Sequence, residues 1–167
     1  MRIFIIGYMG SGKTTVGKNL AQRLKFCFID MDTFIEQKYH RTISNYFEAD
    51  GEEKFREIEH LALKEIIKLE NIVVATGGGT PCFYDNMDQM NRQGITIYLK
   101  MEVQALANRL KNNQSKRPLI KGKTQSQLIE YITKTLAERK KYYQKSHYTI
   151  ETINLNTTEL VKQISGI

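Results

Sequence analysis

The stretch Gly7-Tyr8-Met9-Gly10-Ser11-Gly12-Lys13-Thr14 decides how this chain folds. It fits the pattern G-x-x-x-x-G-K-[ST], in which glycines allow backbone N–H groups to turn inward around phosphate oxygens. An apolar, strand-like run at residues 3–6 precedes it, and a helix-like segment at 13–24 follows, with apolar side chains one turn apart. A strand, a phosphate-binding loop and a helix in this order predict a nucleoside triphosphate site.

The residues of this loop have separate predicted tasks. Lys13 is a candidate catalytic residue that would reach the β- and γ-phosphates, and the Thr14 hydroxyl can ligate Mg²⁺. A dinucleotide-binding turn is disfavoured, because the glycines read G-x-x-G-x-G instead of G-x-G-x-x-G. An ordinary glycine-rich turn is the alternative. The candidate ATP-binding residues of the loop are Gly10, Ser11, Gly12, Lys13, Thr14 and Thr15.

Length and composition indicate one globular domain over residues 1–167. Apolar residues make up 41% of the chain and charged residues 26%. No segment approaches the roughly 18 apolar residues of a membrane span, and residues 3–6 are too short for a signal peptide. Cys27 and Cys82 lie far apart and are expected to be reduced thiols. We therefore expect a cytoplasmic protein that does not bind membranes.

The positive charge is concentrated in one part of the chain. The net charge is +7, and residues 109–145 carry eleven Lys and Arg against Glu130 and Glu138, so this segment has a net charge of +9. Such a segment is compatible with nucleic-acid binding. A site for a triphosphate and an anionic acceptor needs the same charge, and the phosphate loop favours that interpretation. Regulatory GTPases are disfavoured, because neither N-K-x-D nor D-x-x-G occurs.

Apolar runs rich in β-branched residues alternate with helix-like segments, which predicts an α/β fold with a parallel sheet. The predicted strands are residues 3–6, 26–29, 72–75, 95–99 and 147–150. The predicted helices are residues 13–24, 32–39, 43–49, 52–69, 84–93, 102–110, 126–145 and 157–164. The polar, basic segment 111–123 is expected to be a mobile loop.

Two carboxylates follow the second predicted strand, at the edge of the sheet where ligands collect. Asp30 and Asp32 would project from the same face if the chain stays extended. One carboxylate could then hold Mg²⁺ through water, and the other could accept a proton from an attacking hydroxyl. Alternatively, Asp32 caps a helix that begins at Thr33. The third strand lacks a terminal acidic residue, so Thr14 and, through water, Asp30 form the candidate metal site.

Further candidates lie at the glycine triplet and among the arginines. Gly77-Gly78-Gly79 costs backbone entropy and favours the close approach of a ligand, with a plain tight turn as the alternative. Arg56 and Glu59 share a helix face, where Arg56 could hold a carboxylate or the two could form a solvated surface pair. Arg117 could close over phosphates, whereas Arg139 could be a cation at a helix C-terminus.

Together, these residues resemble those of the shikimate kinases. The resemblance rests on the loop at 7–14, Asp30-x-Asp32, Phe55-Arg56-x-x-Glu59, Gly77-Gly78-Gly79, Arg117-Pro118-Leu119, and Arg139 followed by Tyr143. Met31 and Thr80-Pro81-Cys82 depart from the family's commoner pattern. The resemblance implies a three-layer α/β/α fold with a five-stranded parallel sheet in the order 2-3-1-4-5. It also implies an acceptor-binding region near 32–60 and a mobile lid near 111–123.

The resemblance further implies transfer of the γ-phosphate of ATP to the 3-hydroxyl of shikimate, with Mg²⁺, in the pathway to the aromatic amino acids. Asp32 would contact the accepting hydroxyl and act as the base. Arg117 would reach the phosphates from the lid, and Arg109 would lie against the adenine. The implied acceptor-binding residues are Asp32, Arg56, Glu59 (which orients Arg56), Gly77, Gly78, Gly79 and Arg139. The expected partners are ATP and shikimate, with neither nucleic acid nor membrane, and a monomer is expected.

Two alternatives remain from the sequence. Another small P-loop kinase, for gluconate or a nucleoside monophosphate, would share the phosphate loop and lid but would not need Arg56, Glu59 and the glycine triplet together. A non-catalytic nucleic-acid binder would use the basic segment 109–145 and would leave Asp30 and Asp32 without a role.

Overall fold

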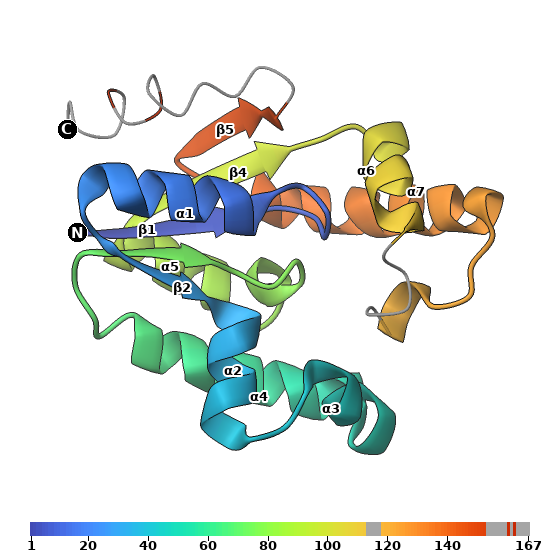
Figure 1. The fold of residues 1–167 in the computed structure, drawn as a ribbon, viewed down its shortest axis with the longest axis horizontal. Coiled ribbons are helices and arrows are strands. Elements are labelled where there is room, and N and C mark those ends of the chain that lie inside the picture. Colours follow the sequence, from blue (N-terminus) through green and yellow to red (C-terminus); the bar gives the residue numbers. More distant parts are fainter. Residues whose placement is uncertain (113–117, 153–159, 161, 163–167) are drawn as a thin grey trace.

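The computed structural model describes residues 1–112, 118–152, 160 and 162. At its centre is a five-stranded parallel sheet in the order β2-β3-β1-β4-β5. Figure 1 shows β4 and β5 on one side of β1 and β2 on the other. The strands are β1 (Arg2–Ile6), β2 (Cys27–Asp30), β3 (Ile72–Ala75), β4 (Ile95–Lys100) and β5 (Tyr148–Glu151). The predicted sheet is therefore confirmed, with each strand within one residue of its expected bounds.

The central strand β1 is apolar from Ile3 to Ile6 because both faces of the sheet are covered. Successive side chains of a strand point to opposite faces. Ile3 and Ile5 accordingly lie in one hydrophobic cluster, and Phe4 and Ile6 lie in another. All four side chains are fully buried. This arrangement is typical of parallel sheets with helices on both sides.

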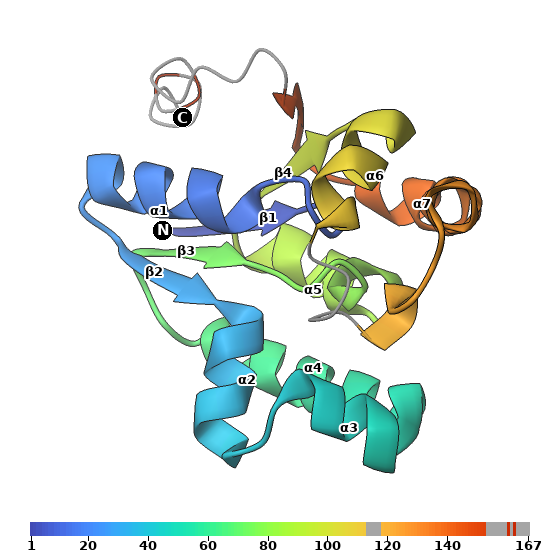
Figure 2. The same ribbon diagram turned by 45° about the vertical axis from the view of Figure 1, so that its right-hand side comes forward.

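Helices cover these two faces. On the face of Ile3 and Ile5 lies α1 (Lys13–Leu24), which buries Val16 and Leu20 there. The opposite face is covered by α2 (Met31–Tyr39), α4 (Gly51–Ile66), α5 (Asn86–Gln93) and α7 (Gln125–Tyr143). Figure 2 shows α1 and α4 on opposite sides of the strands. The three-layer α/β/α prediction is confirmed.

Two groups of helices stand beyond the carboxyl ends of the strands. One group consists of α2, α3 (Ile43–Ala49) and the start of α4, and the other consists of α6 (Val103–Lys111), the short turn η3 (Pro118–Ile120) and the start of α7. Figure 1 shows them on different sides of these strand ends. Ile120 is fully buried in a cluster with Leu106 and Leu128, so the segment expected to be mobile is anchored at this residue. Residues 113–117, including Arg117, lie outside the described residues.

Several helix bounds differ from the prediction. The helix expected at 52–69 begins at Gly51 and ends at Ile66. The helix expected at 84–93 begins only at Asn86, because Tyr84 adopts a left-handed φ of 51° that interrupts a helix. The helix expected at 157–164 falls largely outside the described residues. None of the helices in the described ranges is both long enough and apolar enough to cross a membrane.

Candidate active site

The loop between β1 and α1 has the geometry of an anion cradle. Gly10 and Gly12 adopt φ angles of 81° and 95°, which side chains disfavour. Gly12 is also the N-cap of α1, so the positive end of the helix dipole faces the loop. The Ser11 hydroxyl is buried and has no hydrogen-bond partner among the described residues. The loop therefore offers backbone and side-chain donors to a phosphate group.

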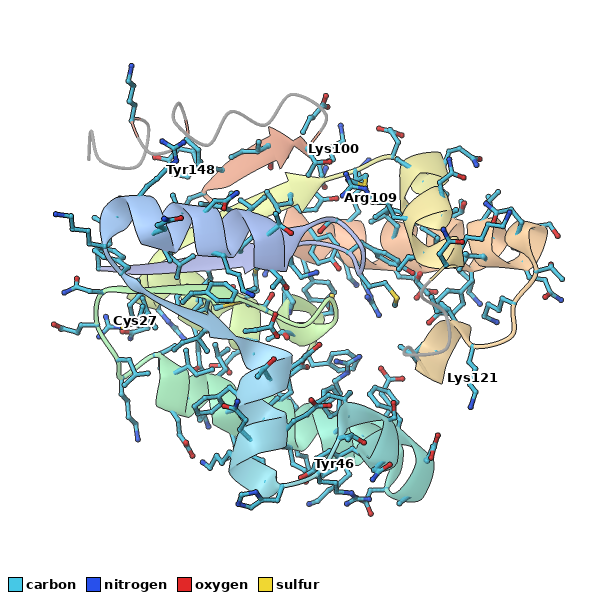
Figure 3. The ribbon with its side chains drawn as sticks, viewed as in Figure 1. Cys27, Tyr46, Lys100, Arg109, Lys121 and Tyr148 are labelled. Atoms are coloured by element: carbon cyan, nitrogen blue, oxygen red, sulfur yellow. The ribbon has the colours of Figure 1, made fainter. Side chains whose placement is uncertain are left out.

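Two basic side chains lie against this loop. Lys13 Nζ donates to the carbonyls of Gly7 and Tyr8, at 3.0 and 2.9 Å. Arg109 comes from α6 and donates from Nη1 to the Gly10 carbonyl at 3.3 Å. Figure 3 labels Arg109 next to α6. The structure thus brings Arg109 to the phosphate loop, and its contact with adenine stays a prediction.

Asp30 and Asp32 do not act as a pair on one extended face. The chain turns into α2 at Met31, and Asp30 caps this helix by accepting the Thr33 N–H at 3.4 Å. The alternative in which Asp32 is the cap is therefore wrong. Asp30 Oδ2 also accepts a hydrogen bond from Thr14 Oγ1 at 2.8 Å, whereas Asp32 lines a separate cavity.

The Thr14 hydroxyl and the Asp30 carboxylate form an oxygen donor set that fits Mg²⁺. This ion binds oxygen ligands, usually keeps several waters and takes the rest from substrate phosphates. Within the described part of the chain, no three or more His, Cys, Asp or Glu side chains gather as a metal cage. The residues present therefore fit an ion that arrives with a nucleotide better than a resident metal.

A cavity of about 440 Å³ opens beside the phosphate loop. Its walls come from α2, α3, α4, the segment after β3, η3 and α7, so distant parts of the chain meet there. The volume is in the range of small-molecule sites. All the acceptor-binding residues expected from the resemblance are in its lining, which consists of Met9, Asp32, Glu36, Ile43, Ser44, Phe47, Phe55, Arg56, Glu59, Gly77, Gly78, Gly79, Leu119 and Arg139.

Arg56 and Glu59 are buried at 5% and 1% exposure, so the surface-pair alternative is wrong. Arg56 Nη1 donates to Glu59 Oε2 at 2.9 Å. Its Nε and Nη2 donate to Glu52 Oε1 at 3.2 and 2.8 Å. A guanidinium has five N–H donors, so within the described residues these contacts leave one on each terminal nitrogen. Two such donors can hold a carboxylate through both of its oxygens.

The glycine triplet gives space to these same side chains. A Cβ atom on Gly79 would lie 2.5 Å from Arg56 Nη2, and one on Gly77 would lie 2.4 Å from Glu59 Oε1. Real Cβ atoms do not approach so closely. The triplet is therefore in close contact with side chains of the cavity, and the Gly77 and Gly79 carbonyls also accept turn hydrogen bonds from the Thr80 and Cys82 N–H groups. The close approach of a ligand to the triplet stays a prediction.

Arg139 lies inside α7 and not in its last turn, whose basic residues are Lys140 and Lys141. The alternative role as a C-terminal cation is therefore wrong. Its guanidinium lies 5.3 Å from the centre of the Tyr8 ring. Burial lowers the pKa of Arg139, but Tyr143 and Tyr8 outweigh this effect and raise it overall. Arg139 thus stays positively charged at the cavity wall.

The two departures from the family pattern have different consequences. Met31 is fully buried in the core and does not line the cavity. Burial raises the pKa of the Cys82 thiol to about 11, so this side chain is neutral and unreactive at neutral pH. Cys27 and Cys82 both carry free thiols.

Sequence reasoning missed several residues of the site. Phe47 and Ser44 line the cavity but belong to no charged or glycine-rich motif, so only the fold brings them there. Leu119 also lines it and belongs to the Arg117-Pro118-Leu119 motif, but no role of its own in the site was predicted for it. Glu52 could have been found, because it stands one helical turn before Arg56 and has the opposite charge.

Comparisons with known proteins agree with this geometry. The family model described as shikimate kinase matches residues 9–166. The shikimate kinase of Parabacteroides distasonis is 44% identical over 165 residues, which cover 99% of this chain and 95% of that protein. This chain belongs to the shikimate kinase family. It is an ATP-dependent phosphotransferase with shikimate kinase activity.

Solved shikimate kinase structures share the fold. The enzyme from Bacteroides thetaiotaomicron superimposes with a TM-score of 0.91 at 39% identity, covering 99% of this chain and 97% of that one. The enzyme from Acinetobacter baumannii, solved in complex with shikimate, gives 0.86 at 35% identity and covers 98% of this chain and 90% of that one. The sheet order expected from the resemblance is thus confirmed, and the gluconate, nucleotide and nucleic-acid alternatives gain no support.

Proposed function

We propose that this shikimate kinase transfers the γ-phosphate of ATP to the 3-hydroxyl of shikimate, giving shikimate 3-phosphate and ADP on the route to chorismate. The observation that carries this proposal is the convergence of Arg56, Arg139 and Asp32 in one cavity beside the phosphate loop. Two guanidinium groups match a carboxylate, and a carboxylate matches a hydroxyl. A small hydroxylated acid presents both groups.

On the acceptor side, Arg56 and Arg139 would hold the shikimate carboxylate, with Glu59 orienting Arg56 and the glycine triplet forming the adjoining wall. This contact fixes the ring so that one hydroxyl faces Asp32. Asp32 would align this hydroxyl and accept its proton as the new bond to phosphorus forms. Phosphoryl transfer depends mainly on such positioning and on charge stabilisation.

On the donor side, Gly10–Thr15 would hold the triphosphate of ATP. Lys13 would exchange its contacts with the Gly7 and Tyr8 carbonyls for the β- and γ-phosphates. Arg117 would reach the phosphates from the lid, and Arg109 would lie against the adenine. Thr14 and, through water, Asp30 would hold Mg²⁺, which neutralises charge on the phosphates when bound.

We further propose that the chain acts as a cytoplasmic monomer consisting of one domain over residues 1–167. The region 32–60 would bind the acceptor, and the region near 111–123 would form the lid. The basic segment 109–145 would serve the two anionic substrates, with neither nucleic acid nor membrane as a partner. Its charge and the position of Arg139 in the cavity wall support this assignment.

Identification of the product tests the proposed reaction. The protein is incubated with ATP, MgCl₂ and shikimate, and the mixture is followed by ³¹P NMR. We expect a new phosphomonoester signal coupled to the proton on C3 of shikimate, formed only when both substrates are present. Gluconate and AMP in place of shikimate should give no phosphorylated product. A phosphate on another hydroxyl, or faster phosphorylation of gluconate or AMP, would contradict the proposal.

A further inference from the structure

Buried side chains behind Arg56 form a hydrogen-bonded chain that leads away from the cavity. Glu59 Oε2 accepts from Arg56 Nη1 at 2.9 Å, and Glu59 Oε1 accepts from Thr80 Oγ1 at 2.6 Å. Thr80 is fully buried and Glu59 is 1% exposed. Because an unpaired oxygen would be costly there, the Thr80 hydroxyl helps to fix the carboxylate that orients Arg56.

Asn86, the first residue of α5, continues this chain. Its Nδ2 donates to the Thr80 carbonyl at 2.9 Å, and its Oδ1 lies 2.6 Å from His60 Nδ1. A backbone carbonyl only accepts, so the amide nitrogen must face Thr80 and the amide oxygen must face His60. That oxygen also only accepts, so His60 Nδ1 carries the hydrogen. The His60 ring stacks on exposed Tyr84 with ring centroids 4.6 Å apart, so the hydrogen-bonded series ends at the protein surface.

The segment 79–86 also contacts Arg56 directly. Gly79 lies so close to the guanidinium that a Cβ would be 2.5 Å from Nη2. Phe83 directly follows η1 (Thr80–Cys82) in the chain, and its ring centroid lies 4.4 Å from Arg56 Cζ, a cation–π contact. A shift of this segment relative to α4 would therefore disturb both the ring and the carboxylate that hold Arg56.

We propose that Thr80, Asn86 and His60 are positioning residues for binding of the acceptor carboxylate. They hold the segment 79–86 onto α4 and thereby keep Glu59 and Arg56 in the binding geometry. The inference rests on the proposed function, in which shikimate is the acceptor. A guanidinium that is fixed beforehand loses less conformational freedom when it binds. A buried polar network keeps such a group in place only when each member is paired.

Matched variants of Thr80 and His60, the two ends of this series of hydrogen bonds, test this role. Thr80→Val removes the hydroxyl and keeps the shape, and Thr80→Ser restores the hydroxyl. His60→Phe keeps a ring to stack on Tyr84 but removes the donor, and His60→Asn restores an N–H near the Nδ1 position. We expect Thr80→Val to raise the KM for shikimate about tenfold and His60→Phe about threefold, while kcat and the KM for ATP change less than about twofold. The Ser and Asn variants should return to within about twofold of the wild-type values.

Thermal unfolding of each variant is measured alongside the kinetics. If Thr80→Val does not fold, the KM of the His60→Phe variant for shikimate decides the test, because His60 is only half-buried and lies at the outer end of the hydrogen-bonded series. Folded Thr80→Val and His60→Phe variants with a wild-type KM for shikimate would overturn the inference, and so would equal increases in both KM values. A wild-type protein that does not phosphorylate shikimate would instead contradict the proposed function itself, and this inference with it.

Discussion

Arg56 owes its predicted role to the shape of its side chain as well as to its charge. Arg56→Lys keeps the charge and removes the forked donors that reach Glu52, Glu59 and the acceptor. Lost hydrogen bonds between charged groups cost about 1.5–3 kcal/mol, so the KM for shikimate should rise at least about tenfold. The KM for ATP should not change, because the phosphate loop is untouched. Steady-state kinetics with each substrate varied in turn measure both values.

Arg41→Lys is the matched control for this change. Arg41 pairs with Asp50 and does not line the cavity. Its variant should keep both KM values of the wild type. Equal effects of the two substitutions would contradict the assignment of Arg56 to the acceptor.

Asp30 and Asp32 stand two positions apart but have different neighbours, so their variants should differ. Asp32→Asn removes the proposed base and should lower kcat by about 100-fold or more, with an unchanged dependence on Mg²⁺. Asp30→Asn weakens the oxygen pair formed with Thr14 Oγ1 and should shift activation to higher Mg²⁺ concentration. The rate measured as a function of Mg²⁺ separates the two roles. If both variants reached half of their maximal rate at the same Mg²⁺ concentration, the separate roles of Asp30 and Asp32 would be contradicted.

Helix α7 connects the two substrate sites. Tyr143 Oη donates to the Gly78 carbonyl at 2.6 Å, and Thr135 on the same helix lies 2.5 Å from Tyr8 Oη of the phosphate loop. Tyr143→Phe leaves the Gly78 carbonyl without this donor and should cost about 1–2 kcal/mol of stability, or a few degrees in Tm. It should also raise the KM for shikimate, because Arg139 lies one turn away on the same helix. Tyr142→Phe, which is half-buried, is the control and should leave Tm and KM unchanged.

The inner strands β1, β3 and β4 could be predicted from the sequence because they are largely buried on both faces. The edge strands β2 and β5 are more exposed and were predicted from short runs of apolar residues. The unbroken apolar run of β1 has no other simple explanation in a chain of this kind. Helix ends were less predictable, because they depend on single backbone angles. The left-handed Tyr84 delays α5, and the turn at Met31 makes Asp30 the cap of α2, and neither leaves a compositional signal.

The charged part of the candidate site could be predicted because strand ends and motif spacing bring it to one edge of the sheet. The burial of these charged side chains and the apolar residues around them could not be predicted. An Arg and a Glu three positions apart look the same in a sequence whether they are solvated or buried, and only the packing around Arg56 decides this. The apolar wall residues Phe47 and Leu119 come from packing between distant segments.

The whole molecule should lose stability at alkaline pH. Burial raises the pKa of the Cys82 thiol from 9.0 to about 11. It also raises the pKa of the phenols Tyr8, Tyr98, Tyr131 and Tyr143. In the unfolded chain these groups release their protons at lower pH, so the unfolded state binds fewer protons and stability falls as pH rises above about 9.

Thermal unfolding between about pH 7 and about pH 11 measures this loss, which should show as a continuous fall in Tm above about pH 9. Tyr143→Phe removes one of the buried acids and should make the fall shallower. A Tm that stays constant over the whole range would contradict the burial of these groups.

The initial rate of ADP formation with shikimate as the acceptor tests most directly whether the cavity beside the phosphate loop is the acceptor site. The rate is measured with ATP and Mg²⁺ in the presence of shikimate, gluconate, AMP or no acceptor. Shikimate should raise ADP formation far above the rate without acceptor, and gluconate and AMP should leave it at that rate. ADP formation that shikimate does not stimulate would contradict the assignment of the cavity and of its arginines.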